Sequence, residues 1–189
     1  MIPPVQVPAL LALLAQLVSS HAPASTLAET PAPAFPVTSG GGLTWAVPKT
    51  WVSGPSSAMR LATYLLPAAA GDVERPELAV FWFGPGQGGS VDANVQRWFS
   101  QFASSPADPK PTRSLMRVGT LPVTLVKAAG TYSAGTGMGD ASPAKRGFAL
   151  RGAIAEGPDG AVFFKLTGPR RSVAAAGKNF DALVASLKP

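Results

Sequence analysis

The sequence predicts an α+β fold, a mostly antiparallel sheet of about six to seven strands with helices on its faces. Short apolar or alternating runs typical of strands outnumber the stripes typical of helices. The 20 glycines and 20 prolines provide turns between short elements, and tight connections between the later runs favour hairpins. With 189 residues, 46% of them hydrophobic and 14% charged, the chain can form one domain with a substantial core.

The N-terminal region has the pattern of an export signal. Residues 7–18 form an apolar run that is shorter than the roughly 20 residues of a membrane-spanning helix, and a buried helix is the less favoured alternative. Ala22-Pro23-Ala24 provides the small residues of a cleavage site, although no Lys or Arg precedes the run. We therefore expect a signal peptide over residues 1–24, a Pro/Gly-rich linker over residues 25–42 and a single domain over residues 43–189. The protein is then exported, either periplasmic or extracellular, or tethered to a membrane if the leader is not cleaved.

The first half of the domain predicts three strands and a helix. Leu43–Val47 alternates as a strand does, Met59–Leu66 is a second strand, and Leu78–Phe83 is apolar on both faces, which predicts cover on both sides. The sequence GPGQGG at residues 84–89 cannot continue that strand, because proline has no N–H and glycine permits a sharp reversal. Ser90 then suits a helix N-cap. An apolar stripe at helical spacing follows it: Val91, Val95, Trp98, Phe99 and Phe102.

The second half predicts four strands and a final helix. Ser114–Val118 and Leu121–Thr131 are joined tightly, and Ser133–Gly147 is a surface loop rich in small residues. Phe148–Ala155 and Ala161–Thr167 flank Pro158-Asp159-Gly160, a hairpin turn because Asp and Gly accept the φ values that it requires. The final helix carries one apolar stripe: Val173, Ala176, Phe180, Leu183, Val184 and Leu187.

The glycine-rich corner before the first helix matches G-x-G-x-x-G at Gly84, Gly86 and Gly89. A dinucleotide-binding fingerprint is not favoured, because the following segments are predicted strands and no acidic strand end follows about 20 residues on. A Walker A loop is excluded, because no Lys-Ser/Thr pair follows. We interpret the corner as a tight connection. The alternative is a weak anion or partner contact at the N–H groups of Gly88, Gly89 and Ser90.

The residue types exclude several chemistries. The single histidine, His21, lies in the expected leader, and the chain has no cysteine. A mature chain without these residues cannot build Ser-His-Asp or Cys-His nucleophile systems, disulfides, or imidazole and thiolate zinc sites. The S-x-x-K match at Ser142–Lys145 falls by chance in a loop, and Asp72 and Glu74 lack the further oxygen ligands of a calcium site. We expect no enzymatic activity, no cofactor and no metal.

The positive charge is moderate, with 16 Lys and Arg against 10 Asp and Glu. Arg170 and Arg171 precede the final helix, where positive charge is unfavourable to the helix dipole. We interpret them as part of a solvated surface. The sharper alternative is that both contact an acidic partner or a phospholipid headgroup at the membrane surface. Binding to nucleic acid is not expected, because the positive charge is not concentrated on one predicted helix and because export separates the protein from nucleic acid.

Three stretches carry a resemblance to a known group: L-T-W-x-V-P-x-x-W at Leu43–Trp51, the strand–GQGGS–helix unit that ends in Gln96-Arg97-Trp98, and FFKLTGP at Phe163–Pro169. The chain resembles uncharacterised bacterial exported proteins with a Mog1/PsbP-like fold over roughly Leu43 to Lys188. The resemblance implies an α/β/α sandwich with an antiparallel sheet. That fold hosts binding and assembly proteins, and its motifs are structural, so no functional residue carries over.

Two functions follow as hypotheses. The first is a non-enzymatic exported binding or assembly module that acts on an unknown protein or envelope component. The second is a small-ligand or lipid-binding protein with a cavity between helix and sheet, its walls including tryptophans 45, 51, 82 and 98. An exposed apolar or charged patch favours the first, and an apolar pocket of about 300 Å³ or more favours the second.

Overall fold

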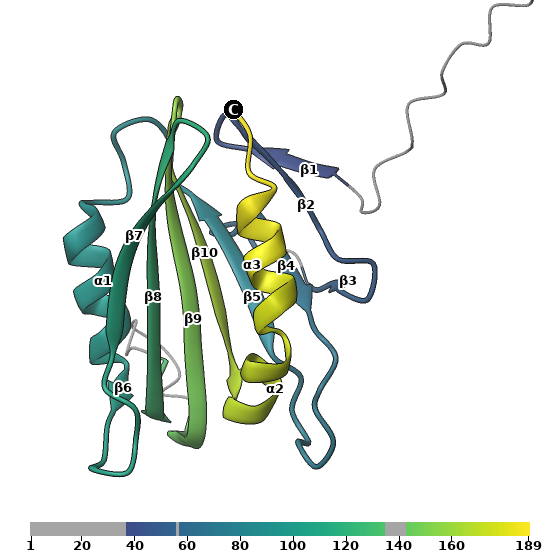
Figure 1. Cartoon of the computed structure of the whole chain (residues 1–189), viewed down its shortest axis with the longest axis vertical. Helices are drawn as coiled ribbons and strands as arrows, with labels where there is room; N and C mark the ends of the chain where they lie inside the picture. Colours follow the sequence, from purple (N-terminus) through teal and green to yellow (C-terminus); the bar gives the residue numbers. More distant parts are fainter. Residues whose placement is uncertain (1–36, 56, 135–142) are drawn as a thin grey trace, which may run out of the picture. The chain divides into compact units, whose positions relative to one another are not determined.

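The computed structural model describes residues 37–55, 57–134 and 143–189 (Figure 1). The expected leader, residues 25–36 of the expected linker, and Ser142 lie outside these residues. The elements follow in chain order: β1 (Val37–Gly40), β2 (Leu43–Ala46), β3 (Val52–Ser53), β4 (Ala62–Leu65), β5 (Glu77–Trp82), α1 (Val91–Ser100), β6 (Phe102–Ala103), β7 (Thr112–Val118), β8 (Leu121–Tyr132), β9 (Lys145–Gly157), β10 (Gly160–Pro169), α2 (Arg170–Ala175) and α3 (Gly177–Ala185).

The described strands form one large antiparallel sheet and one small hairpin. Eight strands make the large sheet in the order β3-β4-β5-β10-β9-β8-β6, with β7 also paired to β8. Each pairing within it is antiparallel. The strands β1 and β2 pair with each other in a separate hairpin. The predicted α+β class with a mostly antiparallel sheet is therefore confirmed.

Helices lie on both faces of the large sheet, with α1 on one side and α2 and α3 on the other (Figure 1). The alternation of β10 explains how one strand serves both faces. Phe163 packs with Trp98 of α1, whereas Phe164 belongs to the core that contains Phe180 of α3. The two aromatic neighbours in the sequence thus anchor two different cores.

The connection from β5 to α1 forms as the sequence predicts. Ser90 is the N-cap of α1, and its hydroxyl accepts a hydrogen bond from the Ala93 amide at 3.1 Å. Gly88 has a φ of +90°, and a Cβ added there would lie 2.8 Å from the Phe83 ring. Glycine is required at Gly88 for both its backbone conformation and its close approach to Phe83.

Several element boundaries differ from the predicted ones. The linker was expected to reach residue 42, but Val37–Gly40 form β1, because Gly41 and Gly42 adopt φ values of +61° and +73° and join it to β2. The loop expected over residues 133–147 ends earlier, because Lys145 pairs with Tyr132 and begins β9.

Two further elements were predicted differently. The sequence predicted one final helix, but the chain forms α2 and then α3, which begins at Gly177. Glycine is a weak helix former, and a Cβ at Gly177 would lie 3.0 Å from the Arg151 guanidinium. The short strand β6 was not predicted. It includes Phe102, which was assigned to the stripe of the first helix and is buried in the core beneath it.

Within the part of the chain that the structure describes, no helix is both long and apolar enough to cross a membrane.

Candidate functional site

The residues predicted as an anion or partner contact lie in two separate places. Gly88 lies beside the Phe163 ring, which a Cβ on Gly88 would approach to 3.1 Å. Arg170 directly follows the end of β10. Phe163 comes seven positions before Arg170, which at about 3.4 Å per residue separates the two places by about 24 Å along the strand. The corner with Gly88, Gly89 and Ser90 and the two arginines therefore cannot form one site.

The corner and the arginines are also partly used by the fold itself. The Gly88 carbonyl accepts a hydrogen bond from the Asn94 side chain at 2.8 Å, and the Ser90 hydroxyl caps α1. Arg170 forms an ion pair with Asp108, and Arg171 is exposed beside Gly71. Hydrogen bonds from the Ser105 amide and hydroxyl, together with Arg170, lower the pKa of Asp108 to about 2.

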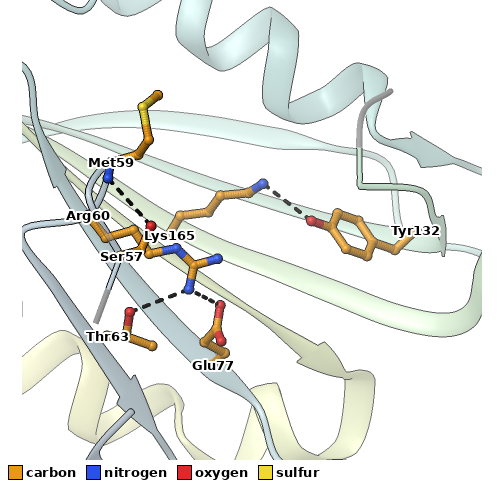
Figure 2. Close-up of polar contacts among 7 residues, drawn as sticks. All are labelled: Ser57, Met59, Arg60, Thr63, Glu77, Tyr132 and Lys165. Carbon is orange, nitrogen blue, oxygen red and sulfur yellow. Dashed lines mark hydrogen bonds and ion pairs between the residues drawn. The ribbon is translucent and has the colours of Figure 1, made fainter. Parts of the chain in front are cut away.

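The structure instead shows a largely buried lysine that the sequence analysis did not single out. Lys165 lies in β10 on the side of the sheet that faces α1 (Figure 2). Its cross-strand neighbours are Ala79 of β5 and Gly152 of β9. Gly152 makes room for the Trp98 ring, since a Cβ there would lie 2.5 Å from it. The Lys165 ammonium donates to the Gln101 side-chain oxygen at 2.6 Å and weakly to the Tyr132 hydroxyl at 3.5 Å. It also lies 5.4 Å from the centre of the Tyr132 ring, within cation–π range.

A second cation lies next to Lys165. The Arg60 guanidinium lies between Thr63 and Glu77, as Figure 2 shows. It pairs with the Glu77 carboxylate at 2.7 Å and lies 5.9 Å from the centre of the Phe81 ring. Arg60 precedes β4, and Glu77 begins β5, so adjacent antiparallel strands bring the pair together.

Positive charge exceeds negative charge around Lys165. Arg97 of α1 adds a third cation and donates to the Asn94 side chain, while Glu77 supplies the carboxylate. Burial, and then the charges of Arg60 and Arg97, lower the pKa of Lys165 to about 8, and Glu77 opposes this effect. Among the described residues, no carboxylate lies within ion-pair distance of the Lys165 ammonium.

The pKa of the neighbouring Tyr132 is raised, whereas that of Lys165 is lowered. Burial, and then the charge of Glu77, raise the pKa of the Tyr132 hydroxyl, and Arg60 opposes this effect. Tyr132 is therefore neutral around pH 7, and its hydroxyl can accept a hydrogen bond from Lys165 or donate one to a ligand.

The side chain of Lys165 borders a cavity of about 190 Å³ between α1 and the sheet. We call it the Lys165 cavity, and aromatic and polar side chains line it: Phe81, Phe83, Asn94, Arg97, Trp98, Gln101, Phe163 and Lys165. Of the four tryptophans predicted as cavity walls, Trp98 is the one that lines it. Trp45 is buried in the other core, and Trp82 donates its indole N–H to the Asp159 carbonyl at 3.0 Å.

The Lys165 cavity is suited to holding an anion. With a pKa of about 8, the Lys165 amine is mostly protonated at pH 7, which favours charge pairing over nucleophilic attack. The sequence contained one overlooked signal for it, a single lysine inside the apolar run AVFFKLT of β10. A charge at an inward position of such a run is costly unless it has a polar or ionic partner.

The carboxylates of Asp72 and Glu74 and the ammonium of Lys145 have structural partners. Asp72 accepts hydrogen bonds from Ser172, and Glu74 pairs with Lys145 at 2.5 Å. Across the described ranges, no cluster of three or more His, Cys, Asp or Glu side chains could hold a metal ion.

Comparisons with known proteins give similarity to solved structures alone. No protein-family profile matches the chain, and no curated protein matches it. The crystal structure of PA94 from Pseudomonas aeruginosa, a protein of unknown function, is 14% identical with a TM-score of 0.45, covering 82% of this chain and 96% of PA94. A structure from Bacteroides thetaiotaomicron is 14% identical with a TM-score of 0.40. The match covers 79% of this chain and 46% of the chain from Bacteroides thetaiotaomicron. At these scores the likeness carries no argument about function.

Proposed function

We propose that the chain is a non-enzymatic exported binding module that holds an acidic group of a protein or envelope component in the Lys165 cavity. The observation that carries the proposal is a largely buried ammonium beside two further cations, with no carboxylate at ion-pair distance among the described residues. A partner's carboxylate would supply the missing negative charge.

The size of the cavity favours a group presented by a larger partner. Pockets for whole small molecules usually measure about 300 Å³ or more, whereas the Lys165 cavity measures about 190 Å³. One acidic side chain can fill such a space while the rest of the partner contacts the rim. The rim includes Phe83, which is 38% exposed and offers apolar contact area.

The Mog1/PsbP-like fold is part of the proposal. Its support is the resemblance of the three sequence stretches, together with helices on both faces of an antiparallel sheet. The exported location rests on the pattern of the first 24 residues.

A small-ligand or lipid-binding role is the second candidate. The observation that favours it is the aromatic wall of the Lys165 cavity, formed by Phe81, Trp98 and Phe163. The ligand would then be a small organic acid, with its carboxylate at Lys165 and its apolar part against the rings.

The test compares capture of envelope components by wild type, Lys165→Met and Lys178→Met. Lys178 is exposed on α3, so its variant removes one charge far from the cavity. A protein component retained by wild type and Lys178→Met but lost with Lys165→Met, and released as the pH rises from 7 to 9.5, supports the proposal. Recovery of a small acid alone supports the second candidate, and equal capture by all three proteins contradicts both.

A further inference from the structure

A second surface lies at the edge of the sheet, along β7. This strand pairs with β8 over its whole length, from Thr112 opposite Lys127 to Val118 opposite Leu121. Among the described residues no strand pairs with its other edge, and residues 112–117 are all exposed. The outward-facing N–H and C=O groups of β7 therefore meet solvent within that part of the chain.

The edge has one of the usual protections against pairing and lacks the others. Proteins commonly guard an exposed edge with charged side chains, a very short strand, a proline, a bulge or a covering loop, and β7 has the charged side chains Arg113 and Arg117. The strand β7 has seven residues, contains no proline and keeps an unbroken register with β8. Its exposed backbone is thus a template for one more strand.

The side chains of β7 divide into two rows. Leu115 lies opposite Thr124, which in turn lies opposite Ile154 of the core under α1, so Arg113, Leu115 and Arg117 project on the α1 side. Leu115 is 75% exposed. The other row faces α3 and includes Ser114 and Met116, which line a groove of about 520 Å³ that extends to α3.

We propose that β7 accepts an extended acidic segment of a partner protein as an added antiparallel strand. Backbone hydrogen bonds along β7 give the affinity, and the α1-side row selects the sequence. Arg113 and Arg117 lie four residues apart on one side with Leu115 between them, so the matching segment has the pattern acidic-x-apolar-x-acidic. This surface is three strands away from Lys165 in the sheet order and does not depend on the Lys165 cavity.

The two arginines can engage an incoming acid. Arg113 already pairs with Asp92 of α1 at 2.6 Å, and both side chains are exposed enough for solvent or a partner to compete. Arg117 donates to the Thr120 carbonyl at 3.2 Å, which leaves guanidinium donors for a carboxylate.

The same arginines argue against a second copy of the chain as the occupant. If β7 paired with β7 of a second copy over all seven residues, Arg113 would lie directly opposite Arg117 at both ends. Like charges directly opposite each other in an antiparallel pair are destabilising. An acidic segment removes this repulsion and replaces it with attraction.

The test uses the full chain and a fluorescent seven-residue peptide, Thr-Glu-Thr-Val-Thr-Glu-Thr, in an anisotropy titration. We expect saturable binding to wild type and to Arg146→Glu, which changes an exposed arginine on β9 outside the edge. Arg117→Glu should raise the Kd about tenfold, and a peptide with lysine in place of both glutamates should bind Arg117→Glu better than wild type.

A peptide methylated on alternate backbone amides separates strand addition from simple charge attraction. It keeps both glutamates but cannot complete the hydrogen-bonded ladder, so we expect its binding to be lost. The proposal is overturned if the methylated and unmethylated peptides bind equally. It is also overturned if the unmethylated peptide fails to bind, or if wild type forms a dimer that Arg117→Glu stabilises.

Discussion

At the scale of single residues, Lys165 shows how the fold places a charge between the sheet and a helix. Ala79 and Gly152 lie opposite it in the sheet, and the Trp98 ring of α1 packs over Gly152, where a Cβ would lie 2.5 Å from the ring. Gln101 and Tyr132 accept hydrogen bonds from the ammonium at the end of the Lys165 side chain, but both are neutral. The folded protein therefore holds this charge less favourably than water does.

The first prediction concerns how stability depends on pH. The pKa of Lys165 is about 8 in the folded chain and 10.5 in the reference state, so between these values the unfolded chain binds more protons. Stability should therefore rise with pH, by about 2 kcal/mol from pH 7 to 9.5, and fall again towards pH 7. Urea denaturation at a series of pH values measures the free energy of unfolding.

Two variants check that the slope comes from Lys165. Lys165→Met keeps the apolar stem, and its free energy of unfolding should lack the rise, whereas Lys178→Met should keep it. The range stops at pH 9.5 because the raised pKa of Tyr132 acts in the opposite sense above about pH 10. An identical slope in wild type and Lys165→Met would show that the lysine is not the titrating group.

At the scale of elements, the start of α2 depends on a residue one hundred positions earlier. Pro169 is the N-cap of α2 and has no side chain that can accept a hydrogen bond. The Asp72 carboxylate takes this role, accepting from the Ser172 amide at 3.0 Å and from the Ser172 hydroxyl at 2.5 Å. That hydroxyl in turn accepts from the Ala69 amide at 2.8 Å, which fixes the loop before β5 to α2.

The second prediction follows from this contact. Asp72→Ala should lower the free energy of unfolding by about 1–2 kcal/mol, because the Ser172 amide and its buried hydroxyl lose their acceptor. Asp72→Asn should recover part of the loss, since its amide oxygen can still accept. Glu156→Ala, an exposed change on β9, serves as the control. Equal stability of Asp72→Ala and the control in urea denaturation would argue against the capping role.

At the scale of the whole molecule, the proposed function requires export. The third prediction is that residues 1–24 are removed and that the mature chain begins near Ser25 after the Ala22-Pro23-Ala24 pattern. Mass spectrometry of the full chain expressed in a bacterial host measures the N-terminus. Ala24→Asp should block removal, because the site requires a small neutral residue. An intact Met1 on the exported wild-type protein would contradict the cleavage prediction.

The sequence by itself determined the local elements around the first helix. These elements are the corner glycines with positive φ, the Ser90 cap and the apolar stripe of α1. Each depends on residues that are close together in the sequence, so periodicity and turn chemistry predict it. The same holds for the hairpin at Asp159 and Gly160, which joins β9 to β10. The antiparallel α+β class follows from such local connections.

Only the tertiary structure decided which segments become neighbours. The Lys165 cavity combines side chains from β5, α1 and β10. The hydroxyl of Tyr132 in β8 accepts a weak hydrogen bond from the Lys165 ammonium. The edge of β7 is exposed because β7 pairs with β8 on one side and, among the described residues, with no strand on the other. The cap of α2 depends on a carboxylate one hundred residues away in the sequence. The spacing of residues in the sequence does not predict such contacts, because they form between residues that are distant in the chain.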